Sequence, residues 1–253
     1  MSSGEFSGKV ALVTGGGSGI GRATAIAFAK AGAKVAVDDI NQETGLETVA
    51  LIQAEAGQAI FILADVTDEN AVERMVAETV AAFGRLDCAF NNAGISGGSL
   101  PGEYWDSEIF ARTVAVNQFG VFYCMKHEIA QMLKQGGGAI VNTSSIAGMS
   151  GAGHPGYVAS KHAAAGLARG AALSYATQGI RVNAVCPGAI RTPMVQRVVE
   201  SSETNRRLIE NMHPMNRIGE AQEVADAVLF LCSDKASFIT GHPLAVDGGY
   251  LAR

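Results

Sequence analysis

A tyrosine, a lysine and a serine are spaced along the sequence as an acid–base site would require. Tyr157 stands four residues before Lys161, and on a helix these two positions share a face, which brings the ammonium group near the phenol. A positive charge at that distance favours the phenolate and lowers a phenol pKa from its usual value of about 10. Ser144, at the end of an apolar run, could donate a hydrogen bond to a carbonyl oxygen beside the phenol. The pattern predicts proton transfer near neutral pH.

Each part of this set also has an ordinary interpretation. Tyr-x3-Lys pairs occur on many solvated helices, and paired serines are common in turns. A serine hydrolase would place its nucleophile in a G-x-S-x-G elbow with a histidine base. Ser144 lies between Asn-Thr and Ser-Ile instead, and nothing marks the nearby His154 as a base. The sequence therefore argues against a serine nucleophile and leaves His154 as a residue that could line a substrate pocket.

A glycine-rich turn joins the first apolar run, Lys9–Val13, to the first helical pattern. Gly15, Gly19 and Gly21 follow the spacing Gly-x3-Gly-x-Gly. Without Cβ atoms in the turn, free backbone N–H groups and the positive end of the helix can approach a diphosphate. The alternative is a tight turn with no ligand.

Acidic residues end the next two apolar runs. Asp38 and Asp39 follow the second run, about 20 residues beyond the glycines, where an acid can bind both hydroxyls of an adenosine ribose. A carboxylate there would repel a 2′-phosphate and Ser18 supplies no positive charge, so NAD is favoured over NADP. We assign the ribose to Asp39 and expect Asp38 to be a solvated turn residue. Asp65 ends the third run, with an N-cap as its alternative role, although Asp68 is better placed for capping.

The elements that must position these residues alternate along the chain. Near-continuous apolar strands separated by helices indicate a parallel sheet with helices on both faces, and we expect one doubly wound α/β domain of the Rossmann type over residues 1–253. The segment Arg191–Met215 is either a mobile flap over a substrate or an exposed helix pair. Expected strands are Lys9–Val13, Lys34–Asp38, Ala59–Leu63, Leu86–Phe90, Gly138–Val141, Ile180–Val185 and Pro243–Val246; expected helices are Ile20–Ala31, Gln42–Glu55, Glu69–Phe83, Ser107–Leu133, Tyr157–Thr177, Val195–Glu210 and Gln222–Cys232.

Composition excludes several classes of protein. With 48% hydrophobic residues the chain can bury a large core, and a net charge of −5 argues against nucleic-acid binding. The four cysteines have no metal-ligand spacing, the histidines form no H-x-x-x-H pair, and the apolar runs are shorter than the ~18 residues of a membrane span. We expect a soluble cytoplasmic protein with no metal and no membrane partner.

Taken together and in order, the motifs resemble the short-chain dehydrogenase/reductase family in its ~250-residue form. The resemblance runs from Gly8-Lys9 to Val246-Asp247-Gly248-Gly249 and is carried by Thr14-Gly15…Gly19-Ile20-Gly21, by Asn91-Asn92-Ala93-Gly94, by Ser144, Tyr157 and Lys161, and by Pro187-Gly188. It implies a seven-stranded parallel sheet in the order 3-2-1-4-5-6-7. It also implies reversible hydride transfer between NAD(H) and a secondary alcohol or ketone, with Tyr157 as acid–base.

The resemblance implies a role for each matching residue. Lys161 would lower the pKa of Tyr157 and hold the nicotinamide ribose, Asn117 would support a water relay to the lysine, and Ser144 would orient the substrate oxygen. We choose Ser144 over Ser145 from its distance to Tyr157. The expected cofactor contacts are Gly15, Ser18, Gly19, Ile20, Gly21, Asp39, Asp65, Val66, Asn91, Ala93, Gly94, Thr143, Tyr157, Lys161, Pro187, Gly188, Ile190 and Thr192, and the substrate contacts are Ser96, Ile146, His154 and Met194.

Two other functions and the oligomeric state stay open at this point. An NADPH-dependent reductase of 3-oxoacyl-carrier-protein thioesters would usually carry a basic residue where Ser18 stands, and a dinucleotide-binding regulator would need no catalysis. Gly166 and Gly170 give one helix a smooth face. That face either packs on the sheet of the same chain or admits a partner helix in the homotetramer that the resemblance implies, alongside a small-molecule substrate.

Overall fold

The computed structural model describes residues 4–98 and 104–253, and its centre is a seven-stranded parallel sheet. The strand order is β3-β2-β1-β4-β5-β6-β9, which is the predicted order, with β9 as the seventh strand of this sheet. Because β1 lies between β2 and β4, the chain reverses direction across the sheet at that point, where doubly wound folds bind their ligands. The strands are β1 Val10–Val13, β2 Lys34–Asp39, β3 Gln58–Leu63, β4 Cys88–Asn91, β5 Gly138–Thr143, β6 Ile180–Pro187 and β9 Pro243–Val246.

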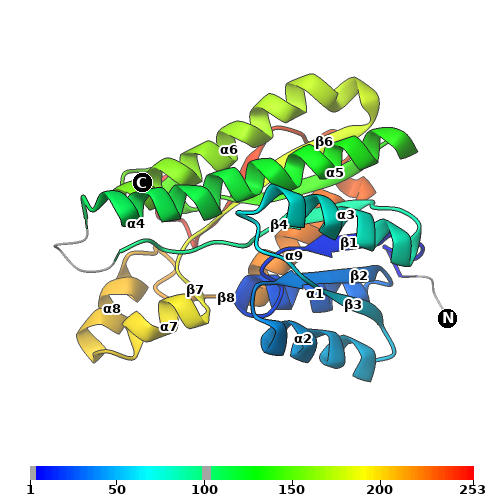
Figure 1. Ribbon diagram of the computed structural model, residues 1–253. Coiled ribbons are helices and arrows are strands. Elements are labelled where there is room, and N and C mark those ends of the chain that lie inside the picture. Colours follow the sequence, from blue (N-terminus) through cyan, green and yellow to red (C-terminus); the bar gives the residue numbers. More distant parts are fainter. Residues whose placement is uncertain (1–3, 99–103) are drawn as a thin grey trace.

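Helices cover both faces of the sheet, as Figure 1 shows. One face packs against α3, α5 and α6, and the other against α1, α2 and α9. Alternate residues of a strand point to opposite faces, so Leu12 of β1 belongs to the first core while Ala11 and Val13 belong to the second. The helices are α1 Gly19–Lys30, α2 Gln42–Ala54, α3 Glu69–Phe83, α4 Ser107–Val114, α5 Val121–Gln135, α6 Pro155–Tyr175, α7 Pro193–Val199, α8 Glu203–Asn211 and α9 Ala221–Cys232.

Two predicted helices are divided in the structure. The stretch Ser107–Leu133 consists of α4, a π-helical segment Ala115–Gly120 and α5. The stretch Val195–Glu210 consists of α7 and α8, and Ser202 caps α8 by accepting a hydrogen bond from the N–H of Asn205. A serine that caps a new helix ends the preceding one, which a helical apolar pattern alone does not reveal.

The two ends of the α7–α8 segment meet in a second, two-stranded sheet. Its parallel strands β7 Ile190–Arg191 and β8 Gly219–Glu220 pair Ile190 with Gly219. The Arg191 guanidinium also donates to the Glu220 carboxylate at 2.9 Å. Figure 1 shows α7 and α8 standing out from the layers of the main sheet at the side where β7 and β8 lie.

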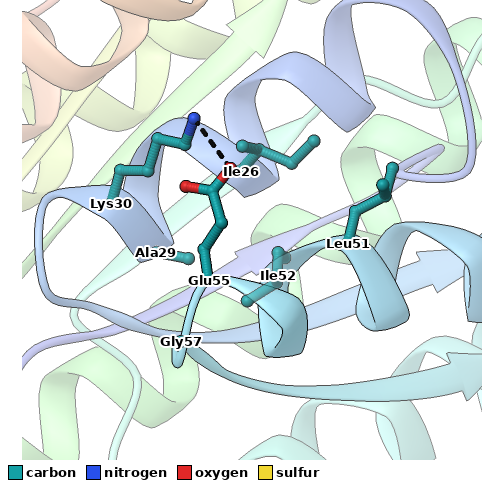
Figure 2. Close-up of a pocket in the computed structure, with 7 residues that line it drawn as sticks. All are labelled: Ile26, Ala29, Lys30, Leu51, Ile52, Glu55 and Gly57. Atoms are coloured by element: carbon teal, nitrogen blue, oxygen red, sulfur yellow. Dashed lines mark ion pairs between the residues drawn. The ribbon is translucent and has the colours of Figure 1, made fainter.

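A small hollow lies between α1 and α2, away from the carboxyl ends of the strands (Figure 2). Ile26 and Ile52 line it, and an ion pair of 3.1 Å between Lys30 and Glu55 crosses it. Its volume of about 20 Å³ is close to that of a single water molecule. This hollow is therefore not a candidate for a cofactor or substrate.

Candidate active site

The glycine-rich turn is locked to the end of β4 by side chains on both sides. The Thr14 hydroxyl accepts hydrogen bonds from the N–H groups of Asn92 and Ala93 at 3.0 and 3.1 Å, and the Asn92 amide donates to the carbonyls of Thr14 and Gly15. Gly15 has a φ of +62°, and a Cβ there would lie 2.9 Å from the Cα of Ala93. A Cβ on Gly21 would lie 2.1 Å from the Gly15 carbonyl. Only glycine fits at these two positions.

Helix α1 begins at this turn with its first N–H groups available. Ser18 is its N-cap residue but forms no side-chain capping bond, in contrast to Asp68 of α3 and Asp106 of α4, whose carboxylates accept from backbone N–H groups. Uncapped amides at the positive end of a helix form a site for an anionic group such as a diphosphate. The Arg22 guanidinium donates to the Gly17 carbonyl at 2.9 Å and holds the turn in shape.

The two acids that end β2 have different environments, and the environment of Asp38 is not the one that the sequence predicts. The Asp39 carboxylate stays partly exposed and accepts from the N–H groups of Gly17 and Asn41, each at 2.9 Å. Asp38, predicted to lie in solvent, is only 1% exposed. Its side chain points to the opposite face of the strand, where burial raises the pKa of its carboxyl well above the usual value. Asp39 alone of the two faces the edge where a ribose would lie.

The end of β3 carries the next predicted contacts. The exposed Asp65 carboxylate accepts from the N–H and the hydroxyl of Thr67, at 2.9 and 2.8 Å. Asp68 caps α3 instead, by accepting from the N–H of Asn70. Val66 is buried, and a Cβ on Gly120 would lie 2.8 Å from one of its methyl groups. The backbone at Asp65 and Val66 thus has a fixed position at the edge of the sheet.

Tyr157 and Lys161 lie on the first turns of α6, beside the end of β5. The Lys161 ammonium donates to the Thr143 carbonyl at 2.8 Å and lies 5.6 Å from the centroid of the Tyr157 ring. Burial lowers the pKa of Lys161 to about 8. The pKa of Tyr157 is raised by burial, against a smaller lowering by a hydrogen bond from Ser145. The spacing argument predicts a lowered phenol pKa, but the loss of hydration on burial has the larger effect on it and raises it.

The two neighbouring serines have separate partners. Ser144 is buried, and its hydroxyl donates to the main-chain carbonyl of Lys161 at 2.8 Å. A Cβ on Gly148 would lie 2.2 Å from the Ser144 Oγ, so the hydroxyl is closely enclosed. The Ser145 side chain forms the hydrogen bond with the Tyr157 phenol. The geometry therefore departs from the expectation for Ser144, because successive residues of an extended segment point in opposite directions.

Asn117 lies in the π-helical segment between α4 and α5 and is fully buried. Its carboxamide donates to the Ile95 carbonyl and accepts from the Ile95 N–H, both at 2.8 Å. A Cβ on Gly94 would lie 3.1 Å from the Asn117 Oδ1 and 3.4 Å from the Lys161 Nζ. Asn117 therefore fixes the loop after β4 close to Lys161. Local π-helical geometry often occurs at functional sites.

The segment Pro187–Thr192 passes back over the glycine-rich turn. A Cβ on Gly19 would meet the Thr192 side chain at 3.0 Å. His213, just after α8, fixes this segment from behind: its Nε2 accepts from the Ala189 N–H at 3.2 Å, and its Nδ1 lies 2.7 Å from the Asp247 carbonyl. Gly188 leaves room for the imidazole, since a Cβ there would lie 2.6 Å from His213 Cε1. The side chain of Ile190, which belongs to this segment, is buried.

The four expected substrate contacts divide into two pairs. Ile146 and His154 are buried next to the Ser145–Tyr157 pair, whereas Ser96 and Met194 are exposed. His154 begins α6, where its Nδ1 accepts from the Gly156 N–H at 3.2 Å, and the ring of Tyr104 lies 5.7 Å away. The histidine thus has a structural role as a helix cap in addition to its place near Tyr157.

These residues fit a nicotinamide dinucleotide at the carboxyl ends of the strands. The uncapped start of α1 and its glycine-rich turn suit a diphosphate, and Asp39 suits a ribose. The Lys161 ammonium has three hydrogens and gives one to Thr143, so others stay free for a second ribose. The buried Thr143 hydroxyl also has no hydrogen-bond partner among the described residues.

Comparison with known proteins agrees with this geometry over almost the whole chain. The family model described as enoyl-(acyl carrier protein) reductase matches residues 15–251. The 2,5-dichloro-2,5-cyclohexadiene-1,4-diol dehydrogenase of Sphingobium indicum is 47% identical over 250 residues, which cover 98% of this chain and 99% of the relative. This chain is a short-chain dehydrogenase/reductase. Members of the family bind a nicotinamide dinucleotide and act as oxidoreductases on CH–OH groups.

Further members of the family resemble the chain to a similar degree. The cyclohexanol dehydrogenase of an Acinetobacter species is 44% identical over 252 residues, covering 99% of this chain and 98% of the relative. The crystal structure of levodione reductase superposes with a TM-score of 0.92 at 41% identity, covering 98% of this chain and 99% of that one. The predictions of family, fold and enzyme class are thereby confirmed.

The described part of the chain offers neither a membrane span nor a metal cluster. Within residues 4–98 and 104–253, no helix is both long and apolar enough to cross a membrane. The same residues contain no group of three or more histidine, cysteine, aspartate or glutamate side chains that could hold a metal ion.

Several positioning residues are not apparent from the sequence. Arg22 holds the glycine-rich turn and His213 holds the segment Pro187–Thr192 through bonds to backbone groups, and such bonds leave no mark in the sequence. Glu128 does leave a mark. It shares the buried stripe of α5 with Cys124 and Met132, so a charged residue stands where the 3.6-residue period calls for an apolar one.

Proposed function

We propose that this enzyme interconverts a secondary alcohol on a six-membered carbocycle and the matching ketone, with NAD(H) as cofactor. The observation that carries the proposal is the Ser145–Tyr157–Lys161 arrangement at the carboxyl end of β5. The names of two relatives support the substrate class, since one is a cyclohexadiene-diol dehydrogenase and the other a cyclohexanol dehydrogenase.

In this proposal the protein handles the proton and holds the reactants. The cofactor supplies hydride transfer at the carbon of the substrate. Tyr157 passes a proton to or from the substrate oxygen, and Ser145, rather than Ser144, donates a hydrogen bond to that oxygen. Lys161 holds a ribose hydroxyl with the hydrogens it does not give to Thr143. Asn117 supports the water relay through its main chain, since both polar atoms of its side chain bind Ile95.

A screen with a matched set of substrates tests this proposal. We expect the absorbance of reduced nicotinamide to change with cyclohexanol- or cyclohexanone-type compounds and NAD(H), and to change much less with open-chain secondary alcohols. Turnover of 3-oxoacyl thioesters with NADPH would favour the carrier-protein reductase, to which the description of the family model points. Tight NADH binding without any turnover would favour a regulator.

The preference for NAD rests on Asp39. We expect Asp39→Ser combined with Ser18→Arg to move the ratio of kcat/KM for NADH over NADPH toward NADPH by at least about tenfold, because the change removes a repelling carboxylate and adds a phosphate-binding guanidinium. Asp68→Ser is the control, since it removes a carboxylate at the cap of α3, where serine also caps. If the double variant still prefers NADH to the same degree as the parent, the assignment of Asp39 to the ribose is wrong.

We further propose that copies of the chain assemble through the outer face of α5 and α6, as a homotetramer. A Cβ at Gly166 or Gly170 would have no neighbouring atom within 4 Å, so the smooth face of α6 is not packed on its own sheet. Leu173 of α6 is 89% exposed, and two exposed phenylalanines, Phe119 just before α5 and Phe122 in its first turn, lie on the neighbouring helix. An apolar face of this kind is typical of an interface.

Filling the smooth face tests the assembly. We expect Gly166→Leu with Gly170→Leu to lower the mass measured by sedimentation, because bulky side chains keep the partner helix away. The monomer itself should keep its fold, since leucine forms helix about 0.8 kcal/mol better than glycine at an exposed position. Gly151→Ala, in open space outside the helices, is the control. An unchanged mass in the double variant places the interface elsewhere.

The segment 191–215 is proposed as the substrate lid of a single domain spanning residues 1–253. Its two helices project beyond the main layers, and the paired strands β7 and β8 lie on either side of them in the sequence. We also propose a cytoplasmic location, a view supported by four cysteines that are all free and buried.

A further inference from the structure

Glu128 is a buried acid that the proposed mechanism does not use. It lies on α5, its side chain is 0% exposed, and it faces the sheet between Met125 and Met132. Its Oε2 accepts a hydrogen bond from the Asn91 amide at 3.0 Å. Among the ion pairs of the described residues, none includes Glu128. A buried carboxylate without a cation is costly, so its protonation state needs an explanation.

The Asn91 amide joins Glu128 to the two strands that end at the active site. Asn91 of β4 stands beside Asn142 of β5 in the register of the sheet. Its Nδ2 donates one hydrogen to Glu128 and the other to the Asn142 Oδ1 at 3.1 Å. The Asn142 amide donates in turn to the Ala164 carbonyl on α6 at 3.3 Å. A single chain of hydrogen bonds therefore connects α5, β4, β5 and α6.

Two atoms of this chain are unpartnered, and they lie on the two groups that already share a bond. The Glu128 Oε1 and the Asn91 Oδ1 are both buried, and neither has a hydrogen-bond partner among the described residues. Both atoms are acceptors when Glu128 is ionised, so they cannot satisfy each other. One proton on the Glu128 Oε1 turns it into a donor and removes both deficits at once.

We propose that Glu128 is a positioning residue that works as a neutral carboxylic acid, donating its proton to the Asn91 Oδ1 while accepting from the Asn91 Nδ2. The two bonds close an acid–amide pair of defined geometry. Through Asn142, the pair fixes β5 against α6, whose first turns carry Tyr157 and Lys161. The end of β4, where Asn92 holds the glycine-rich turn, is fixed by the same pair.

The surroundings of Glu128 favour the neutral form. Burial raises the pKa of Glu128 to about 8, and the bond from Asn91 lowers it by less. The titratable groups that face this region are the Cys124 thiol one turn earlier on α5 and the Asp38 carboxyl on β2, and burial raises the pKa of each. Both are uncharged or negative, so neither would stabilise an anion on Glu128.

Glu128→Gln tests the proposal because glutamine forms the same two bonds without a titrating proton. The folded protein holds the Glu128 proton up to a pH of about 8, whereas an unfolded glutamate loses it near its ordinary value of 4.5. The free energy of unfolding of the parent therefore falls relative to that of the variant as the pH rises from 4.5 to about 8. Above that pH, the difference between the two proteins stays constant. We expect the melting temperature of E128Q to match the parent near pH 5 and to exceed it by a growing margin up to about pH 8.

Glu78→Gln, the same exchange on the exposed side of α3, is the matched control and should show no growing margin. If the difference in melting temperature between E128Q and the parent is the same from pH 5 to pH 8, the proposal that Glu128 is a neutral acid is wrong. Infrared spectroscopy reads the proton directly: the carboxylic-acid carbonyl band in the difference spectrum of parent minus E128Q is expected at pH 6 and lost well above pH 8. A difference spectrum without this band at pH 6 also overturns it.

A kinetic readout tests the positioning role. We expect Glu128→Leu, which removes both bonds, to lower kcat at least tenfold with a smaller change in KM, and E128Q to recover most of that loss. Equal kinetics of the leucine and glutamine variants would contradict positioning. This readout rests on the proposed function, whereas melting and infrared spectra do not, so a failure of the function leaves the test of the proton intact. If E128L does not fold, comparing E128Q with the parent keeps the proposal falsifiable.

Discussion

Tyr157→Phe is expected to lower kcat by about 10²–10⁴-fold, the range that general acid–base catalysis contributes. The substitution removes only the phenolic hydroxyl and leaves the ring in contact with Lys161. Because the Ser145 hydroxyl then has no partner on the tyrosine, KM is also expected to change, but less than kcat. Stopped-flow or steady-state absorbance of reduced nicotinamide measures the effect directly.

Tyr175→Phe, at the other end of the same helix, is the matched control and should keep its activity. Fluorescence titration with NADH should give a similar Kd for Y175F and the parent and at most a modestly higher Kd for Y157F, since Tyr157 is one of many expected cofactor contacts. Near-normal turnover of Y157F would remove the acid–base assignment. A loss of NADH binding would instead show that the substitution disturbs the fold of the site.

The two serines are expected to differ in their effect on activity when each is replaced by alanine. Ser145→Ala should lower kcat/KM by about 10²–10³-fold, the effect of losing one hydrogen-bond donor to a developing oxyanion. It should also lower the free energy of unfolding by about 1 kcal/mol, because the Ser145 hydroxyl accepts a buried hydrogen bond from the Ala147 N–H. Ser144→Ala should keep much of the activity. It should lower the free energy of unfolding by about 1 kcal/mol, because the buried bond to the Lys161 carbonyl is lost.

Kinetics on the two alanine variants separate these roles, and thermal melts show how much stability each variant loses. For a chain of this length, 1 kcal/mol corresponds to a fall of about 2–4 °C in the melting temperature. Each of the two alanine variants is the control for the other. Low activity with a normal melting temperature in S144A would return the catalytic role to Ser144.

The fold can be predicted from the sequence because its signals are strong and local. The apolar runs that form β1, β2, β4, β5 and β6 are buried along almost their whole length, so they are recognisable without any knowledge of their neighbours. Strand β9, Pro243–Val246, and helix α3, Glu69–Phe83, have the predicted bounds. Elements of two residues, such as β7 and β8, are missed because a pair of residues has no periodicity to detect.

The site can be predicted only in part, for a different reason. The Tyr157–Lys161 spacing predicts a shared helix face, and both side chains lie beside β5. Which of two adjacent serines faces the phenol depends on how the chain leaves β5, and Ser144 turns inward to Lys161. Distance along the chain does not contain that information.

Burial is the quantity that is hardest to predict from the sequence of this chain. Asp38 resembles a turn residue beside Asp39, yet its position on the inner face of β2 places it under the helices. Similarly, the spacing of Tyr157 and Lys161 suggests a low phenol pKa, while burial raises it. Both predictions were wrong because they considered only the nearby charges. Burial between the sheet and its helices removes water from both groups, and this loss of hydration raises the pKa of each.

The pairing of β7 with β8 has a consequence for how this enzyme can change over evolution. The chain leaves the main body at Arg191 and returns at Gly219, where the two strands are already hydrogen-bonded. Changing the length of the excursion before His213 costs little, since doubling a flexible loop adds only about 0.6 kcal/mol of closure entropy, whereas His213 must keep its bonds to the Ala189 N–H and the Asp247 carbonyl. In the proposed role of this segment as the substrate lid, α7 and α8 can be exchanged or lengthened as a unit, and new substrate range can arise without remodelling the site that holds Tyr157 and Lys161.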